Sequence, residues 1–490
     1  MAETRSKNQK SSFNWKRLLF MVLGVSLFII IFYSPPWPDA VDPMGKHFEL
    51  SHQGKGALAL FMLAGTFWVF EVLPIGVTGI LIGVIQALFF IRPANDAFRD
   101  FMDPSVLFIF GSLSIGMVFT KVGLTKRLAY KMLMIVGEKT SRIYLGCFVV
   151  TALLSHIMAH TAVAATMYPL LVAIYALYTT DTKPTRFGKG LFMGMAFVAG
   201  AGSIVTLLGA ARGIVALGFY KEITGIDVSF FELTYFMAPV GWIMVFLLWG
   251  FFMVLYKPEQ DRIPGLREKA RQLSSEMGPI SRSEIIAVLI VGGTILFLSL
   301  QSFLPVLAPF NKSAIILVGT VLFFVFHILD IHDLESIPWN IILLFAGAMS
   351  IGFCLWQTGA AEWLAINWLT FFQDSHWFIF VMAIAFFIMI MTNFIMNVAA
   401  IAISLPVALV VAPYLGVGGE VILYSALVVA GMPFLMLVGA APNAIAYNSK
   451  QFTSGEFFAA GIPGSILLMA VLGLLILLLW PLMGMEILAG

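Results

Sequence analysis

Residues 143–178 read IYLGCFVVTALLSHIMAHTAVAATMYPLLVAIYALY, and this stretch decides the topology of the chain. Its only polar cluster is Ser155-His156-Ile157-Met158-Ala159-His160-Thr161, at the centre. Basic clusters flank it on both sides, Lys126 to Arg142 and Lys183 to Lys189, and short cytoplasmic loops are enriched in Lys and Arg. A single crossing would put one cluster outside, whereas two half-helices of roughly 15 residues, short of the ~20 needed to span a bilayer, keep both inside. We therefore predict a re-entrant hairpin that enters from the cytoplasm.

A second stretch of the same kind runs from about Trp377 to Leu415, with Thr392, Asn393 and Asn397 at its polar turn. Its flanking loops contain no Lys or Arg, so we expect this hairpin to enter from the outside. Non-helical backbone at membrane depth is tolerated only where it is buried or lines a cavity. Two such turns from opposite faces predict inverted-topology repeats with a binding site between them.

The composition defines the class of protein. Of the 490 residues, 60% are hydrophobic and only 11% are charged, and the mean hydropathy is +0.97. Soluble proteins usually carry about 25% charged residues, so soluble enzymes, nucleic-acid binders and disordered scaffolds are excluded. The apolar runs are continuous rather than alternating, which excludes an outer-membrane barrel. The sequence therefore predicts an all-α polytopic membrane protein. The two cysteines, Cys147 and Cys354, fit neither a disulfide framework nor a metal site.

Basic residues and polar loops divide the chain into parts. We predict a cytoplasmic N-terminus, first helix and outer loop at 1–56, a first repeat at 57–256, a cytoplasmic linker at 257–283 and a second repeat at 284–490. The expected count is about eleven transmembrane helices plus two re-entrant hairpins, at about 143–178 and about 377–415. The N-terminus would lie in the cytoplasm and the C-terminus outside the plasma (inner) membrane.

Residue-level similarity supports the repeat. His160 to Pro169 and Asn397 to Pro406 are both nine-residue steps from a hairpin tip to a proline. Downstream, LLGAAR at 207–212 matches LVGAAPN at 437–443.

At this point the chain resembles the divalent anion:sodium symporter family, which carries citrate, succinate and other di- and tricarboxylates. The resemblance covers about residues 57–485. Trp68 to Thr78 looks like the W-x-x-E-x-x-P-x-x-x-T opening of the family, and Gly123 to Ala129 looks like its G-L-x-x-R-x-A segment. Pro442-Asn443-Ala444 is similar to the end of its T-P-P-N-A motif.

The resemblance implies two sodium sites, a substrate site and a homodimer. One sodium site would use Ser155, His160 and backbone near Gly209, and the other Thr392, Asn397 and backbone near Ile395 and Gly439. By resemblance, the substrate carboxylates would contact both hairpin tips and the positions after them, at His160, Thr161, Ala210, Asn397, Val398 and Ala440. We add Arg212 and Asn443 as substrate-binding candidates from their own chemistry. No cofactor is expected beyond a sodium ion.

This chain departs from the Ser-Asn-Thr tripeptide that the family has at each tip. The tips read Ala159-His160-Thr161 and Met396-Asn397-Val398. His160 offers nitrogen where sodium needs oxygen, so we expect the first sodium site to be impaired and the second to persist. Arg212 stands where the family has neutral residues, and an intramembrane arginine usually faces a cavity or a partner. Our hypothesis is that Arg212, together with a protonated His160, supplies the positive charge that sodium supplies in relatives.

Several residues have alternative interpretations. His156 and His160 have the i, i+4 spacing of a metal pair, but no third ligand is near in sequence. The Ser155 and Thr392 hydroxyls could bond backbone of their own helix. Arg212 could snorkel towards an interface, and Asn443 could hold a broken helix end instead of substrate.

The leading function is secondary active transport of small organic anions by alternating access. An exchanger of carboxylates or sulfonates is a close alternative, and an anion channel is a weaker one. Because Ala, Met and Val replace hydroxyl-bearing residues, a monoanion, a sulfonate or a bulkier acid is a possible substrate. No motif that could activate a nucleophile is present, so an enzyme is not expected.

Overall fold

A computed structural model describes residues 15–41, 46–181, 183–372, 376–394 and 396–488. Almost all of the regular structure is helical, and the one small sheet pairs β1 (Ala40–Val41) antiparallel with β2 (His47–Phe48). Helical folding satisfies every backbone hydrogen bond within the segment, which an apolar environment requires. The first helix, α1 (Trp15–Tyr33), packs against α2, and two series of helices follow it.

The two series have a similar order of α-helices but differ in their short 3₁₀ and π elements. The first comprises α2 (His52–Val69), α3 (Ile75–Leu88), α4 (Ala94–Arg99), η1 (Asp100–Met102), α5 (Pro104–Lys121), α6 (Leu124–Val136), α7 (Thr140–Ile157), α8 (His160–Tyr178), α9 (Arg186–Ser203), α10 (Ala211–Thr224) and α11 (Phe230–Leu255). The second comprises α13 (Arg282–Leu300), α14 (Lys312–Val325), α15 (Ile331–Glu335), α16 (Trp339–Gln357), α17 (Ala360–Phe372), α18 (Trp377–Phe394), α19 (Asn397–Val411), η2 (Ala412–Leu415), α20 (Gly419–Ala430), η3 (Leu437–Gly439), α21 (Ala441–Tyr447) and α22 (Ser454–Leu474), which continues through η4 (Leu475–Leu479) and α23 (Trp480–Leu482).

Between the series lies the linker with α12 (Leu266–Glu276). The α-helices of the two series follow each other in the same order from α2 and α13 to α11 and α22. The duplication and the inverted orientation of the repeats both stay predictions.

Both predicted stretches form a pair of consecutive helices, and their re-entrant course stays a prediction. The first turns at Met158 and Ala159, between α7 and α8, and the second turns between Phe394 and Asn397. Their bounds agree with the predicted 143–178 and 377–415 to within three residues. The arms have 18, 19, 18 and 15 residues, so three of the four are longer than the roughly 15 residues expected from the spanning length.

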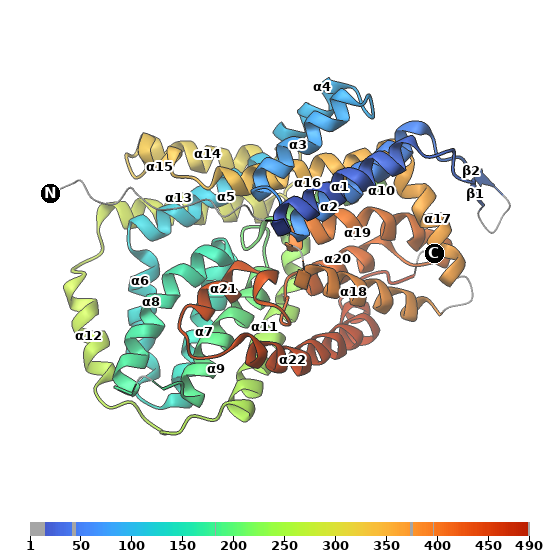
Figure 1. Ribbon diagram of the computed structural model, residues 1–490. Helices are drawn as coiled ribbons and strands as arrows, with labels where there is room; N and C mark the ends of the chain where they lie inside the picture. The colour runs from blue at the N-terminus through green and yellow to red at the C-terminus, as the bar shows by residue number, and fades with distance from the viewer. Residues whose placement is uncertain (1–14, 42–45, 182, 373–375, 395, 489–490) are drawn as a thin grey trace.

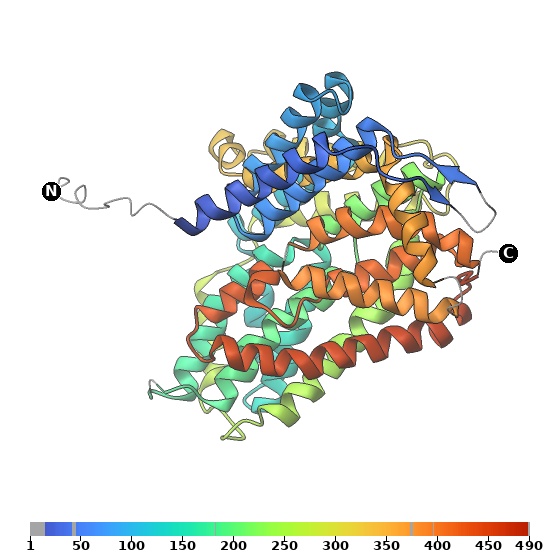
Figure 2. The same ribbon diagram turned by 45° about the vertical axis from the view of Figure 1, so that its right-hand side comes forward.

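The open ends of the two hairpins contact different parts of the chain. The first hairpin begins beside the linker, where the Thr140 amide donates to the Asp261 carbonyl over 3.0 Å. The second ends beside the C-terminal segment, where the Gly418 amide donates to the Ile487 carbonyl over 2.8 Å. In Figure 1 the linker helix α12 lies at the left edge and α17 at the right. Figure 2 shows that α1 and α22 both begin on the left side and end on the right.

Each hairpin is followed by a helix that breaks in its middle. The first is interrupted between α9 and α10, and the second between α20 and α21. The first segments pack within their own half, α9 against α7 and α20 against α18. The second segments pack against the other half of the chain: α10 contacts α19, and α21 contacts α8. The break of each half is thereby brought beside the hairpin of the other half.

Ten helices among the described residues are long and apolar enough to cross a membrane, and α3, α14 and α20 are shorter apolar helices. The ten include both arms of each hairpin, so length and composition alone do not distinguish a re-entrant arm from a span. The chain is a multi-pass membrane protein, and the count of eleven spans stays a prediction.

Candidate functional site

Four helices begin in the interior without a capping side chain. They are α8, α10, α19 and α21, and their N-cap residues are Ala159, Ala210, Met396 and Ala440. Side-chain caps are present at the starts of α9 (Thr185), α11 (Ser229), α13 (Ser281) and α22 (Thr453), whereas α3, α6, α7, α12, α16 and α20 also begin without one. The first amides of a helix carry partial positive charge and are free to bind an anion when no side chain accepts from them. At α8 the first amide, that of His160, already donates to the Gly209 carbonyl, and Pro442 leaves α21 without its second amide. The free amides at the starts of α10 and α19 are therefore the ones best suited to negative charge.

The predicted site residues lie at these helix ends. Ser155 and Thr392 are each two residues before the end of the first arm of a hairpin, and Gly209 and Gly439 lie in the breaks. The others are N-caps or belong to the first three residues of the four uncapped helices: His160, Thr161, Ala210, Arg212, Asn397, Val398, Ala440 and Asn443. Ile395 lies outside the described residues.

The first tip is fastened to the first break by three hydrogen bonds. The His160 amide donates to the Gly209 carbonyl over 3.1 Å, and His156 Nδ1 bonds the Gly202 carbonyl over 2.8 Å. The Thr206 hydroxyl donates to the His156 carbonyl. A methyl group on Gly209 would collide with the Ser155 carbonyl, so this close approach requires glycine.

The second tip is fastened to the second break mainly by Asn393. Its Oδ1 accepts the amides of Leu435 and Met436 at 2.8 and 3.1 Å, and its Nδ2 donates to the Met389 carbonyl over 2.7 Å. Asn393 occupies the position of His156 in the other half, one residue after Thr392 as His156 follows Ser155.

Asn443 holds the broken helix end, the second of its two predicted roles. Its Nδ2 donates to the carbonyls of Pro433 (2.8 Å) and Met436 (3.1 Å), both within the break.

The two groups of sodium-ligand candidates differ. In the first group the Ser155 hydroxyl donates to Thr151 of its own helix, the Gly209 carbonyl accepts the His160 amide, and His160 has no side-chain oxygen. Because His160 offers nitrogen in place of an oxygen ligand, this group fits sodium less well than the second.

In the second group the Thr392 hydroxyl bonds the Ala430 carbonyl over 3.3 Å at the end of α20. The Asn397 side chain has no hydrogen-bond partner among the described residues, and its amide oxygen is free to bind a cation. Gly439 lies close to the Thr392 carbonyl. The second group therefore fits sodium, since unwound carbonyls and helix C-terminal ends are the usual ligands of such a site.

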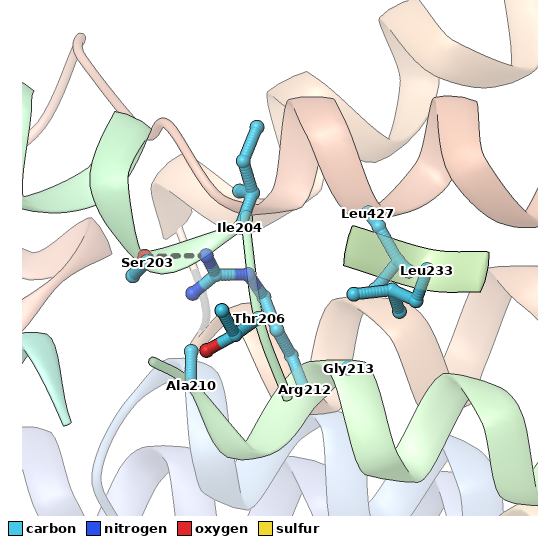
Figure 3. A pocket seen from close by; sticks show the side chains of 8 residues that line it. All are labelled: Ser203, Ile204, Thr206, Ala210, Arg212, Gly213, Leu233 and Leu427. Carbon is cyan, nitrogen blue, oxygen red and sulfur yellow. Dashed lines mark hydrogen bonds between the residues drawn. The ribbon is translucent and has the colours of Figure 1, made fainter. Parts of the chain in front are cut away.

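Arg212 lies between the two breaks and is only 2% exposed. Figure 3 shows its side chain reaching from α10 to Ser203, the last residue of α9, whose hydroxyl accepts from Nη2 over 2.7 Å. A methyl group on Gly431, directly after α20, would lie 2.8 Å from the same nitrogen. The guanidinium is thus placed at the C-terminal ends of α9 and α20, where the helix dipoles favour a cation. It is buried in the interior and does not snorkel.

A small pocket adjoins Arg212 (Figure 3). Its polar part is formed by Ser203, Thr206 and the start of α10, and its apolar part by Ile204, Leu233 and Leu427. Arg212 Nη1 is buried and has no hydrogen-bond partner among the described residues.

The histidine pair does not form a metal centre. No group of three or more His, Cys, Asp or Glu side chains that could hold a metal ion occurs among the described residues. His156 instead bonds backbone and packs edge-on against Trp242, with ring centroids 5.5 Å apart.

Sequence reasoning missed Ser203, Thr206 and the fastening role of Asn393. The equivalence of Asn393 with His156 was the available signal, because both follow the hydroxyl-bearing residue of their tip. Ser203 had no such signal, since only the fold brings Arg212 to it.

Paired helical hairpins facing paired broken helices, in a chain made of apolar helices, define a membrane carrier with a central site. The chain belongs to the family described as sodium:sulfate symporter transmembrane region, whose model matches residues 12–486. The resemblance to a divalent anion:sodium symporter is thereby confirmed. Membership of a symporter family also agrees with the expectation that the protein is not an enzyme.

Two curated relatives match over nearly their whole length. The sodium-dependent dicarboxylate transporter SdcS of Staphylococcus saprophyticus is 22% identical, over 98% of this chain and 95% of its own. SdcS of Staphylococcus aureus strain USA300 is 23% identical, over 96% and 93%. Among solved structures, MtrF of Neisseria gonorrhoeae superposes with a TM-score of 0.55 at 12% identity, covering 94% of this chain and 93% of that one. This likeness concerns the fold alone.

Proposed function

We propose that the protein is a secondary carrier of small carboxylates that works by alternating access. The observation that carries the proposal is the set of four uncapped helix N-termini at the hairpin tips and breaks, together with the buried Arg212. Free amides and a guanidinium both favour a carboxylate. The names of the SdcS relatives support a dicarboxylate as the first substrate class to test.

Coupling to sodium is reduced in this proposal. The first group of sodium ligands lacks a side-chain oxygen at His160, and Arg212 places a fixed cation at the ends of α9 and α20. One sodium ion would bind at Thr392, Asn397 and backbone near Gly439. Arg212 would supply the positive charge of the other, with His160 beside it at the first tip.

A carboxylate or sulfonate exchanger is the second candidate, and the fixed charge of Arg212 favours it. A sodium ion can leave the carrier together with the substrate. An arginine stays in the protein, so it needs a bound anion whenever the carrier changes orientation, in either direction. We further propose a homodimer in the plasma membrane, with a cytoplasmic N-terminus and an external C-terminus.

Transport assays on the purified protein in proteoliposomes test the proposal. Uptake of radiolabelled succinate would be measured under sodium, choline and proton gradients, and in vesicles preloaded with succinate. We expect uptake that persists when choline replaces sodium, or that saturates with a Hill coefficient of about 1 for sodium. The variant Arg212→Gln should lose the uptake seen in choline. A wild-type protein that requires two sodium ions for any uptake would refute reduced coupling.

A further inference from the structure

Arg212 has a charge that its surroundings do not neutralise. It takes part in none of the ion pairs among the described residues, which include a buried pair elsewhere in the chain, Arg92 with Asp100 at 2.7 Å. Nη2 has the Ser203 hydroxyl, but Nη1 is buried without a partner. Buried donors almost always have a partner, so an unpartnered N–H on a cation indicates a missing acceptor.

The pocket beside Arg212 offers a place for that acceptor. Ala210, Arg212 and Gly213, which line it, form the beginning of the 14-residue helix α10, and this helix has no side-chain cap. Two independent features therefore make the pocket positive, the helix N-terminus and the guanidinium. In Figure 3 the guanidinium lies between Ser203 and Thr206 at the polar side of the pocket.

The size of the pocket limits what it can hold. It has room for about one water-sized particle, and Ile204, Leu233 and Leu427 close its other side. A whole organic acid does not fit, and a monatomic halide ion comes nearest to this size; a substrate carboxylate would approach Nη1 only where the halide has left. A halide in this place would have a charged donor at Nη1 and free helix amides, with aliphatic walls instead of a hydration shell.

We propose that this pocket binds a halide, chloride in the cell, when the carrier holds no organic substrate, and that the ion is displaced by a substrate carboxylate. The reasoning rests on the proposed function, because it follows from a fixed arginine taking the place of sodium. An uncompensated cation at membrane depth is costly. The substrate-free carrier therefore needs a small anion to change its orientation, and the organic anion exchanges against halide.

Halide binding can be tested without any transport. The purified protein in detergent would be heated in choline chloride or choline bromide, with choline HEPES at equal ionic strength as the reference, because that anion is too large for the pocket. We expect a saturable rise of the unfolding temperature with either halide. Succinate should raise the halide concentration needed for half of this effect. Additive stabilisation by succinate and halide would overturn displacement.

Two variants and a control show where the halide binds. Arg212→Gln removes the charged donor and should weaken halide affinity by about tenfold or more, whereas Arg212→Lys should retain part of it. The matched control is the double variant Arg92→Gln with Asp100→Asn, which removes another buried arginine and should respond to halide as the wild type does. Anomalous scattering from bromide-soaked crystals should place the ion beside Arg212. A halide effect that is absent, or unchanged in Arg212→Gln, would overturn the proposal.

Exchange of succinate against chloride can be measured directly in proteoliposomes. In sodium-free proteoliposomes, chloride inside the vesicles should accelerate succinate uptake relative to HEPES inside, and labelled chloride should leave as succinate enters. Uptake that needs no sodium but ignores internal chloride would refute the halide return while leaving the proposed function intact. Halide binding at Arg212 without any carboxylate uptake would refute the proposed function while leaving the site.

Discussion

Replacing Asn393 with leucine should loosen the second hairpin tip from the second break. The side chain is fully buried, and its oxygen is the acceptor for the amides of Leu435 and Met436. Leucine has a similar size but leaves both amides without a partner. Each orphaned buried donor costs about 1–3 kcal/mol, and the added apolar side chain returns about 1–2 kcal/mol. The expected net loss of stability is about 2–4 kcal/mol.

The same substitution should weaken sodium binding by more than the loss of folding stability alone would explain. Asn393 directly follows Thr392, so a displaced tip separates Thr392 and Asn397 from the end of α20 and from Gly439. We expect the sodium concentration for half-maximal uptake to rise more than the maximal rate falls. Asn393→Asp keeps both acceptor bonds and should be less damaging to the position of the tip.

The assay for stability is thermal unfolding of purified protein at one scan rate, since membrane proteins often unfold irreversibly. The control is Thr320→Val on α14, a buried threonine whose hydroxyl likewise donates to the carbonyl four residues earlier, that of Ile316. This control should lose about 1 kcal/mol or less. If Asn393→Leu and the control unfold at the same temperature with the same sodium dependence, the fastening role of Asn393 is wrong.

Three further predictions concern the first break, the linker and the buried ion pair. Gly209→Ala should abolish folded protein on size-exclusion chromatography, because its methyl group meets backbone carbonyls, whereas Gly292→Ala, with open space around it, should be neutral. Glu259 lies in the linker. Burial by itself would raise the pKa of this carboxyl, but hydrogen bonds from backbone amides and from the Tyr178 hydroxyl lower it by more. The net pKa is therefore below the usual 4.5. Its stabilising effect is therefore present above about pH 4.5 and lost as the pH falls through the lowered pKa, so Glu259→Gln should unfold at a lower temperature than wild type at pH 7 and converge with it at acidic pH. Arg92→Gln alone should lower the free energy of unfolding by about 3–5 kcal/mol, because it leaves Asp100 buried without its cation. Adding Asp100→Asn should recover most of that loss in the same thermal assay. A double variant as unstable as Arg92→Gln would contradict the pairing.

Much of the fold could be predicted because the signals are local. The hairpins followed from charge on the flanking loops and from a polar cluster within an apolar run, and both helix pairs were found within three residues of the predicted bounds. The length of the arms was underestimated, because a re-entrant arm buried among other helices is not limited to half the bilayer thickness in its residue count. The broken helices were indicated by LLGAAR and LVGAAPN, which mark the two breaks.

The site was predictable in position but not in partners. Its residues were placed at helix ends by their spacing from the tips, but hydrogen bonds between distant segments decided their roles. Asn443 holds the break because the chain between α20 and α21 folds back over it. The Gly209 carbonyl is occupied because the tip amide of His160 reaches it.

By itself the sequence determined that this is an all-α membrane protein with two hairpins and two breaks, because hydropathy and the placement of Lys and Arg act on each segment separately. It also identified Arg212 as a charged residue within an apolar segment. Only the tertiary structure decided what surrounds that charge, since α9, α10 and α20 meet through packing between the two halves of the chain. That packing gives Arg212 one hydroxyl and two helix ends, leaves one N–H without a partner, and places beside it a pocket of the size of a single small ion.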